Sequence, residues 1–203
     1  MVAMYLSNLR RVVFFAAALA ATVAFAQEAP DAMVKRVSQE VLEITRTDAK
    51  VQAGDQARIH EVVDSKLSPY FDFTHMTALA MGRNWPAANP DQQKQLTSEF
   101  KSLLIRTYSG ALSKYRDEKI ELKPLAANPS ATDVTVKTLV VKSGGGTPVP
   151  IDYSMAKTPD GWKAYDVIVG GVSLVTNYRD EFSQQIKDGG IDGLIKTLKA
   201  KNG

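Results

Sequence analysis

The N-terminal half of the chain carries its large apolar residues at helical spacing. After a start signal at Pro30-Asp31, apolar residues recur every three or four positions to about residue 49, which predicts an amphipathic helix. Gly54-Asp55 is expected to end this helix and to cap a second one, which stops at Ser68-Pro69. Two helices therefore open the folded part of the chain.

Two further helices are predicted before the pattern changes. Asp72 or Thr74 is placed to cap a short helix that reaches Met81. A long helix then begins with proline at its first position, Pro90, and its apolar stripe continues to Tyr115. Residues 27–116 are thus expected to be mainly helical.

From Lys119 onward the apolar residues alternate with polar ones, which is the period of a half-buried strand. Four alternating runs cover residues 120–122, 134–140, 149–156 and 162–169, and turn-forming residues separate them. Hairpin spacing between consecutive runs predicts an antiparallel meander of four strands.

The stretch from residue 162 to residue 182 is predicted to turn a strand directly into a helix. Gly170-Gly171 breaks the strand, and Ser173 is placed to cap a helix whose stripe includes Phe182. Gly189-Gly190 then precedes a short amphipathic helix over residues 191–198. The whole pattern predicts an α+β fold: a four-stranded antiparallel meander wrapped by helices, with an N-terminal helical subdomain.

Residues 1–26 have the three-part pattern of a secretory signal peptide. Arg10-Arg11 precedes an apolar run, and Ala24-Phe25-Ala26 is a small-residue cleavage site, so we expect cleavage after Ala26. The run is short for a bilayer span, which disfavours a permanent anchor. We expect residues 27–203 to form one domain, with a mainly helical part (27–116) and a part containing the sheet and the C-terminal helices (117–203).

Charge and cysteine content narrow the classes of function. Removing the signal peptide removes two arginines and no acid, so the formal net charge falls from +3 to +1. No dense Lys/Arg block remains, which argues against nucleic-acid binding. The chain has no cysteine, so an exported domain of this size must be held together by its hydrophobic core.

The sequence contains no recognisable catalytic or metal-binding constellation. His60 and His75 lack the spacing of a metal pair, and no nucleophile elbow, P-loop or dinucleotide-binding motif is present. We expect no catalytic residues, no metal and no cofactor. The sequence is instead rich in apolar stripes, and a curved sheet wrapped by helices can enclose either an ordinary core or a cavity for an apolar ligand.

Three ordered motifs are similar to those of one family. Residues 162–182 resemble the W-x-x-Y-D-V-x-x-x-G-V-S-L-x-x-N-Y-R-x-x-F signature of the MlaC, or toluene-tolerance, family. Residues 70–85 resemble its Y-F-D-F and A-L-G-x-x-W segment, with Met81 in place of leucine, and residues 100–108 resemble its F-x-x-L-L-x-x-T-Y helix. The resemblance spans essentially all of the chain after residue 26.

The resemblance implies a soluble periplasmic phospholipid carrier with a sheet and helices arranged as in nuclear transport factor 2. It also implies two partners: an outer-membrane lipoprotein complex, and an inner-membrane ABC transporter with a lipid-binding ring. The phospholipid would be cargo, with its acyl chains between the helical part and the sheet and its headgroup near the surface. Arg83, Arg106 or Arg179, each beside an apolar stripe, is expected to contact the phosphate.

The acyl chains are expected to contact apolar residues of both parts of the domain. These are Phe71, Phe73, Met76, Leu79, Trp85, Phe100, Leu104, Tyr108, Val134, Val136, Ile151, Tyr153, Val167, Val169, Val172, Leu174, Val175 and Tyr178.

Two other interpretations stay open. One is an enzyme on a similar cone-shaped sheet that acts on a small apolar substrate, with Asp152 or Asp166 as base and Tyr153 or Tyr165 as proton donor. The other is a periplasmic adaptor in which the enclosed space is simply a core.

Overall fold

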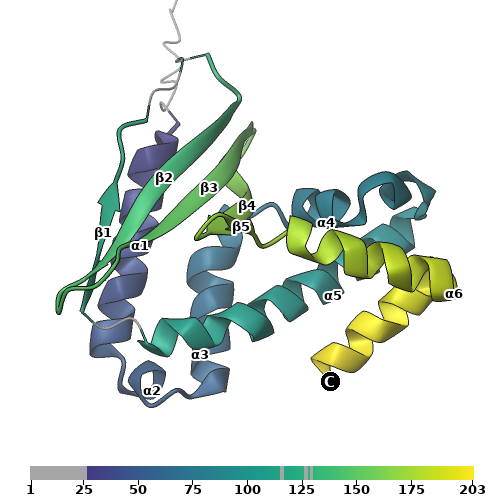
Figure 1. Cartoon of the computed structure of the whole chain (residues 1–203), viewed down its shortest axis with the longest axis horizontal. Helices are drawn as coiled ribbons and strands as arrows, with labels where there is room; N and C mark the ends of the chain where they lie inside the picture. Colours follow the sequence, from purple (N-terminus) through teal and green to yellow (C-terminus); the bar gives the residue numbers. More distant parts are fainter. Residues whose placement is uncertain (1–26, 115–116, 126–127, 129) are drawn as a thin grey trace, which may run out of the picture.

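The computed structural model describes residues 27–203 except 115–116, 126–127 and 129. Figure 1 shows a sheet with α1 (Pro30–Thr47) and α3 (Gln56–Val62) at one end of the molecule and α4 (Phe73–Met81) and α6 (Arg179–Asn202) at the other. Helix α5 (Pro90–Tyr108) runs from the α6 end back toward α3. The expected signal peptide and its cleavage site lie outside the described residues, as does Tyr115.

The first helical segment is a long helix followed by two short helices with aspartate caps. Helix α1 (Pro30–Thr47) is followed by α2 (Ala49–Gln52) and α3 (Gln56–Val62). The Asp48 carboxylate accepts hydrogen bonds from the first turn of α2, and Asp55 accepts one from the Arg58 amide of α3. The helix starting near Asp55 is therefore confirmed, but it continues as a π-helix, η1 (Val63–Leu67), and a 3-10 turn, η2 (Ser68–Tyr70).

The second helical segment follows the sequence pattern closely. Helix α4 (Phe73–Met81) is capped by Asp72, and a 3-10 turn, η3 (Gly82–Ala87), leads to α5 (Pro90–Tyr108). Asn89 and Gln92 form a capping box at the start of α5. The prediction that this helix reaches Tyr115 is wrong, because α5 ends at Tyr108 and a 3-10 segment, η4 (Ser109–Lys114), follows.

The sheet is an antiparallel meander of five strands in sequence order. The four predicted strands are β1 (Glu118–Leu122), β2 (Asp133–Lys142), β3 (Val149–Thr158) and β4 (Gly161–Val169), and a two-residue strand, β5 (Val172–Ser173), is added. Pairing of Ile151 with Val169 and of Tyr153 with Val167 places these four side chains on one face of the sheet, as the alternation predicted.

The predicted direct passage from strand to helix is wrong in one detail. Gly170 and Gly171 both have positive φ (59° and 87°), the geometry of a two-residue hairpin turn, so the chain folds back into β5. Ser173 lies in this strand and caps no helix; its hydroxyl accepts a hydrogen bond from the Thr176 amide at the start of the 3-10 turn η5 (Thr176–Tyr178), whose N-cap is Val175. Helix α6 (Arg179–Asn202) begins afterwards.

Buried Asp166 holds this strand, turn and helix segment together. Its Oδ1 accepts hydrogen bonds from the amides of Val167 (2.8 Å) and Val175 (3.2 Å), and its Oδ2 accepts one from the Ser173 hydroxyl (2.5 Å). A buried carboxylate is tolerated because these donors replace water.

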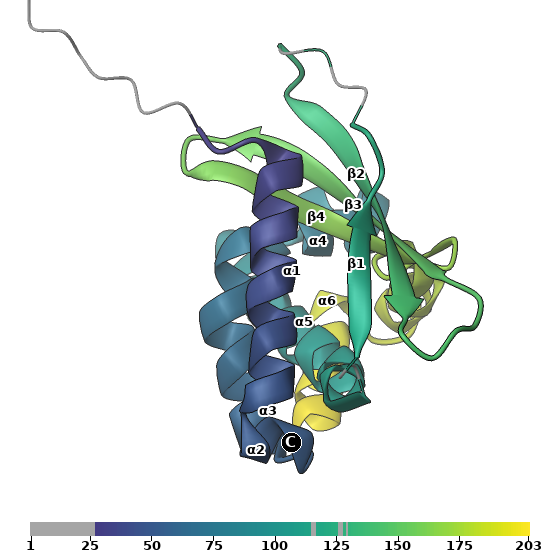
Figure 2. The same cartoon turned by 90° about the vertical axis from the view of Figure 1, so that its left-hand side faces the viewer.

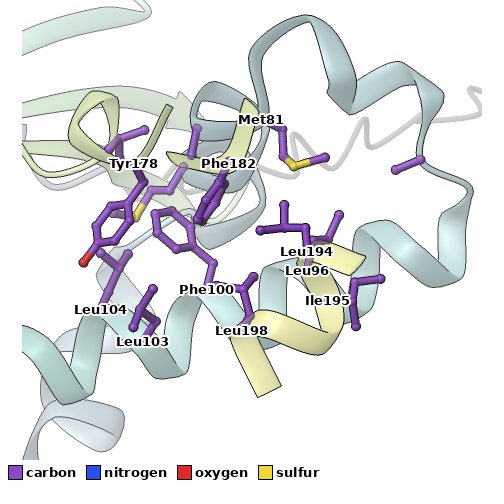
Figure 3. Packing of buried hydrophobic residues seen from close by; sticks show 14 residues of the cluster. Met81, Leu96, Phe100, Leu103, Leu104, Tyr178, Phe182, Leu194, Ile195 and Leu198 are labelled. Atoms are coloured by element: carbon purple, nitrogen blue, oxygen red, sulfur yellow. The ribbon is translucent and has the colours of Figure 1, made fainter. Parts of the chain in front are cut away.

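The two largest hydrophobic clusters are built around α5 and around the sheet. In one, Phe100 of α5 meets Tyr178 and Phe182 edge to face, with ring centroids 5.2 and 5.1 Å apart, and leucines of α5 and α6 surround them (Figure 3). Helix α6 reaches α5 twice because it kinks at Gly190, where φ is 68°. In the other cluster, Met33, Val34 and Val37 of α1 pack with residues of β2, β3 and β4. Figure 2 shows α1 lying against the sheet.

Candidate functional site

An apolar cavity of about 110 Å³ lies where the helical segments meet the sheet. Its walls come from η1, the start of α4, one face of α5, β4 and the residue after β5. The lining residues are Val63, Leu67, Ser68, Phe71, Phe73, Met76, Leu104, Ile105, Tyr108, Val167 and Leu174. Almost every side chain in this set is apolar, so the cavity suits hydrocarbon.

A second apolar cavity of about 50 Å³ lies beneath α1. It is lined by Met33, Val34, Val37, Ser38, Leu67, Tyr70, Phe71, Tyr153, Met155 and Ala164. Leu67 and Phe71 line both cavities, so these two side chains separate one apolar space from the other.

The backbone at Phe71 is attached to the sheet. Phe71 forms a parallel bridge with Ala164 of β4, and the Asp72 amide donates to the Ala164 carbonyl at 2.9 Å. The segment that supplies Phe71 and Phe73 to the cavity is therefore fixed to β4 by main-chain hydrogen bonding.

A broad polar pocket of about 770 Å³ adjoins the larger apolar cavity on the outside of the molecule. It lies between α3, η1, α5 and the C-terminal end of α6, and Ile105 lines both spaces. Charged groups of both signs line it, among them Asp64, Lys101 and Arg106. The site thus combines an apolar interior with a charged, open exterior.

The family profile described as MlaC protein matches residues 35–200. This chain belongs to the MlaC family. It is 24% identical over 195 residues to the toluene tolerance protein Ttg2D of Pseudomonas putida, with 95% of this chain and 89% of that protein covered. It is 20% identical over 184 residues to the intermembrane phospholipid transport system binding protein MlaC of Haemophilus influenzae, with 89% and 86% covered.

A solved structure of the same kind is more similar still. The phospholipid-binding protein of Ralstonia solanacearum, determined in complex with a phospholipid, is 39% identical and superimposes with a TM-score of 0.80. The match covers 86% of this chain and 97% of that chain. The MlaC-like α+β fold of this chain, with an antiparallel sheet wrapped by helices, is thereby confirmed.

The structure distributes the eighteen residues expected to contact lipid over three environments. Eight line one of the two apolar cavities: Phe71, Phe73, Met76, Leu104, Tyr108, Tyr153, Val167 and Leu174. Seven belong to the hydrophobic clusters and line neither cavity: Leu79, Trp85, Phe100, Val134, Val136, Val175 and Tyr178. The other three, Ile151, Val169 and Val172, lie at the β5 end of the sheet, where Val172 is 57% exposed.

Sequence reasoning missed the cavity residues of α1 and η1. Met33, Val37, Val63 and Leu67 stood in stripes that predicted helices, but a stripe does not say whether its partner surface leaves a space. The π-helical turn of η1 also carried no sequence signal, although it places both Val63 and Leu67 on the cavity wall. Ile105 was missed in the same way.

The three arginines expected near the phosphate lie in different places. Arg179 donates from Nε and Nη2 to the Leu79 carbonyl, at 3.3 and 3.1 Å, and so caps the end of α4. Arg106 lines the polar pocket and donates from Nη1 to the Asn202 carbonyl at 2.7 Å. Arg83 is exposed on η3.

The groups considered for the enzyme alternative are not assembled into one site. Asp166 is occupied by the three donors described above, and Asp152 and Tyr153 project from opposite faces of β3. Burial and the hydrogen bond that Tyr165 donates to Asp133 raise the pKa of Tyr165 to about 12. Its phenol therefore stays protonated at neutral pH.

The histidines remain separate from each other. His60 lines the polar pocket, whereas the His75 ring stacks on Tyr165 with centroids 4.3 Å apart. Within the described part of the chain, no group of three or more His, Cys, Asp or Glu residues is placed to hold a metal ion. Among the residues that the structure describes, no helix has the length and apolar character needed to cross a membrane.

Proposed function

We propose that this protein binds a phospholipid with its acyl chains between the helical segments and the sheet, and that it carries this lipid through the periplasm. The apolar cavity between η1, α4, α5 and β4 supports the proposal most directly. The 39% identical relative from Ralstonia solanacearum, a phospholipid-binding protein solved with a phospholipid, supports the class of ligand.

The size of the cavity implies that the walls separate when lipid binds. Sites for drug-sized ligands usually measure about 300 to 1,000 Å³, and the larger apolar cavity measures about 110 Å³. Leu67 and Phe71, which divide this cavity from its smaller neighbour, are the side chains whose displacement would join the two. Lipid uptake is then an expansion of a space that is already apolar.

Hydrocarbon burial supplies the driving force. Two acyl chains of about 16 carbons each, at about 0.8 kcal/mol per methylene, give a gross gain of about 25 kcal/mol. The same acyl chains gain a comparable free energy when they are buried in a bilayer, so the carrier can compete with a membrane for its lipid. For the same reason, release is slow unless a partner opens the cavity.

The transport role extends the family membership. The Haemophilus influenzae relative is named as the binding protein of an intermembrane phospholipid transport system. We propose that this protein exchanges lipid with an outer-membrane lipoprotein complex and with an inner-membrane ABC transporter that has a lipid-binding ring. Export by cleavage after Ala26 would place the carrier between them, with phospholipid as cargo and no other cofactor.

Mass spectrometry of an organic extract of the purified protein tests the proposal. The expected result is glycerophospholipid at about one or more molecules per chain. A small apolar metabolite in its place would favour the enzyme alternative, and an extract without any apolar ligand would favour an adaptor with an ordinary core. Extraction of a protein of similar size, purified in the same way, controls for lipid carried over from the cells.

A further inference from the structure

An ion pair that lines the polar pocket links η1 to α5 beside the larger apolar cavity. Lys101 Nζ of α5 lies 2.5 Å from Asp64 Oδ1 of η1, and Asp64 also accepts a hydrogen bond from the Ser68 hydroxyl at 3.3 Å. Val63, the residue before Asp64, lines the cavity, and so does Ser68. The pair therefore joins the two walls between which an acyl chain would pass.

Lys101 is positioned by the same face of α5 that lines the cavity. Leu104, Ile105 and Tyr108 follow it at positions i+3, i+4 and i+7, so all four side chains lie along one side of the helix. The Lys101 ammonium lies 5.4 Å from the ring centroid of Phe73, which also lines the cavity. The positive charge thus lies at the boundary between hydrocarbon and solvent.

The space outside this boundary is large enough for a polar headgroup. The polar pocket of about 770 Å³ is lined by Lys101, Asp64 and Arg106, and Ile105 separates it from the apolar cavity. An amphiphile with its chains in the cavity would carry its first polar group past Lys101 into this pocket.

We propose that Lys101 binds the phosphodiester of the carried phospholipid, and that Asp64 is the internal anion that the phosphate displaces. This inference rests on the proposed lipid-binding function and assigns the headgroup contact to one residue, outside the three arginines considered from the sequence. In the displaced state, Asp64 is released to solvent and the ion pair between α5 and η1 is broken. Binding the headgroup and separating the cavity walls are then one event.

The exchange of anions is favourable because the internal pair is weak and the phosphate is tethered. Asp64 is 64% exposed and Lys101 is 33% exposed, and ion pairs with this much solvent contribute little. A phosphate attached to buried acyl chains is present at the rim at a high effective concentration. The Phe73 ring further favours retention of the ammonium at this position.

Substitution of the two partners gives opposite effects if the proposal is right. Lys101→Gln removes the phosphate contact and is expected to speed lipid release about three- to tenfold, whereas Asp64→Asn removes the competing anion and is expected to slow release by a similar factor. An ion pair with a purely structural role would give the same direction for both. Lys94→Gln, at an exposed lysine of α5 that lines none of the pockets, is the matched control and is expected to match the wild type.

The assay follows fluorescent phosphatidylglycerol leaving the loaded protein for acceptor vesicles of phosphatidylcholine. Diacylglycerol with the same fluorophore lacks the phosphate, so all variants are expected to release it equally fast. Changes in the same direction for Lys101→Gln and Asp64→Asn, or an equal effect of Lys101→Gln on diacylglycerol, would overturn the proposal.

Two further outcomes have separate meanings. If inorganic phosphate binds at Lys101 of the delipidated wild type with an affinity that matches its ability to displace the lipid, Lys101 serves a free anion. The assignment of Lys101 to the headgroup is then wrong. If wild-type protein takes up no phospholipid at all, the proposed function itself fails and this inference fails with it. If the wild type loads lipid but Lys101→Gln and Asp64→Asn do not change the release rate in opposite directions, only the role of Lys101 is refuted.

Discussion

The substitution Val167→Trp tests whether position 167 lines a cavity or belongs to a close-packed core. Val167 lies on the inward face of β4 and lines the larger apolar cavity, although it is only 9% exposed. Val136 of β2 lies on the same face, two strands away from Val167, because both valines pair with Tyr153 of β3. Val136 is fully buried and lines neither apolar cavity, so Val136→Trp is a matched control.

The expected magnitudes follow from these environments. In the cavity of about 110 Å³, the added ring atoms occupy room for about four methylenes of an acyl chain. At about 0.8 kcal/mol per methylene, Val167→Trp should weaken lipid binding by about 3 kcal/mol, or about 100-fold. The delipidated variant should unfold within about 1 kcal/mol of the delipidated wild type, because the ring fills existing space.

Val136→Trp should give a different result in the lipid-free protein. A tryptophan forced into close-packed surroundings costs about 1 to 3 kcal/mol or more. For a domain of this size, that cost lowers the melting temperature by about 2 to 12 °C. Both variants are compared with wild type after delipidation, because a bound ligand itself raises the melting temperature. Full lipid content in Val167→Trp, or equal destabilisation of both delipidated variants, would show that Val167 belongs to a core.

Four shorter predictions address other parts of the structure. Asp166→Ala leaves two buried amides and a hydroxyl without their acceptor and should destabilise the protein by about 2 to 4 kcal/mol in urea unfolding, whereas Asp166→Asn, which keeps an oxygen at the site, should cost less than half as much. Since the pKa of Tyr165 is raised to about 12, the folded state retains this proton above pH 10, where the unfolded state loses it. Its contribution to stability is therefore complete below pH 10 and is lost as pH rises to 12, and Tyr165→Phe should flatten the stability profile over that range; an unchanged slope would contradict this. Arg179→Ala should lower the free energy of unfolding by about 1 kcal/mol through the lost contacts to the Leu79 carbonyl and leave lipid release unchanged. The intact mass of the exported protein should correspond to a chain that begins at Gln27, and retention of earlier residues would refute the cleavage site.

The helices and strands could be predicted because each has a local cause in the sequence. Asp55, Asp72 and Asn89 cap helices at the positions where capping residues precede apolar periodicity. The alternation of period two likewise located β1 to β4. The errors occur where local rules compete, as at Gly170-Gly171, where a hairpin turn and a helix start have similar sequences and the pairing of β5 with β4 decides the outcome.

The candidate site was only partly predictable, because a cavity is a property of how surfaces meet. Phe100 and Leu104 lie on the same helix one turn apart, yet Phe100 is enclosed by two aromatic rings and Leu104 lines the cavity. Nothing in the spacing of α5 distinguishes them. The roles of Ile105 and Lys101 depend on η1 lying opposite α5 in the fold. Asp64 of η1, which pairs with Lys101, is 37 residues away in the sequence.

The main-chain attachment of Phe71 to β4 gives the two sides of the cavity unequal rates of amide hydrogen exchange. The Asp72 amide, bonded to the Ala164 carbonyl, should exchange as slowly as the amides of the sheet. The π-helical turn of η1 has no such tie to a strand among the described residues and meets its neighbours through side chains, including the Lys66 and Glu40 ion pair to α1. Its amides should exchange faster, and lipid should slow them. The cavity would then have a rigid wall that carries Phe71 and Phe73 and a mobile wall that carries Val63 and Leu67. The cargo would enter from the side of the mobile wall.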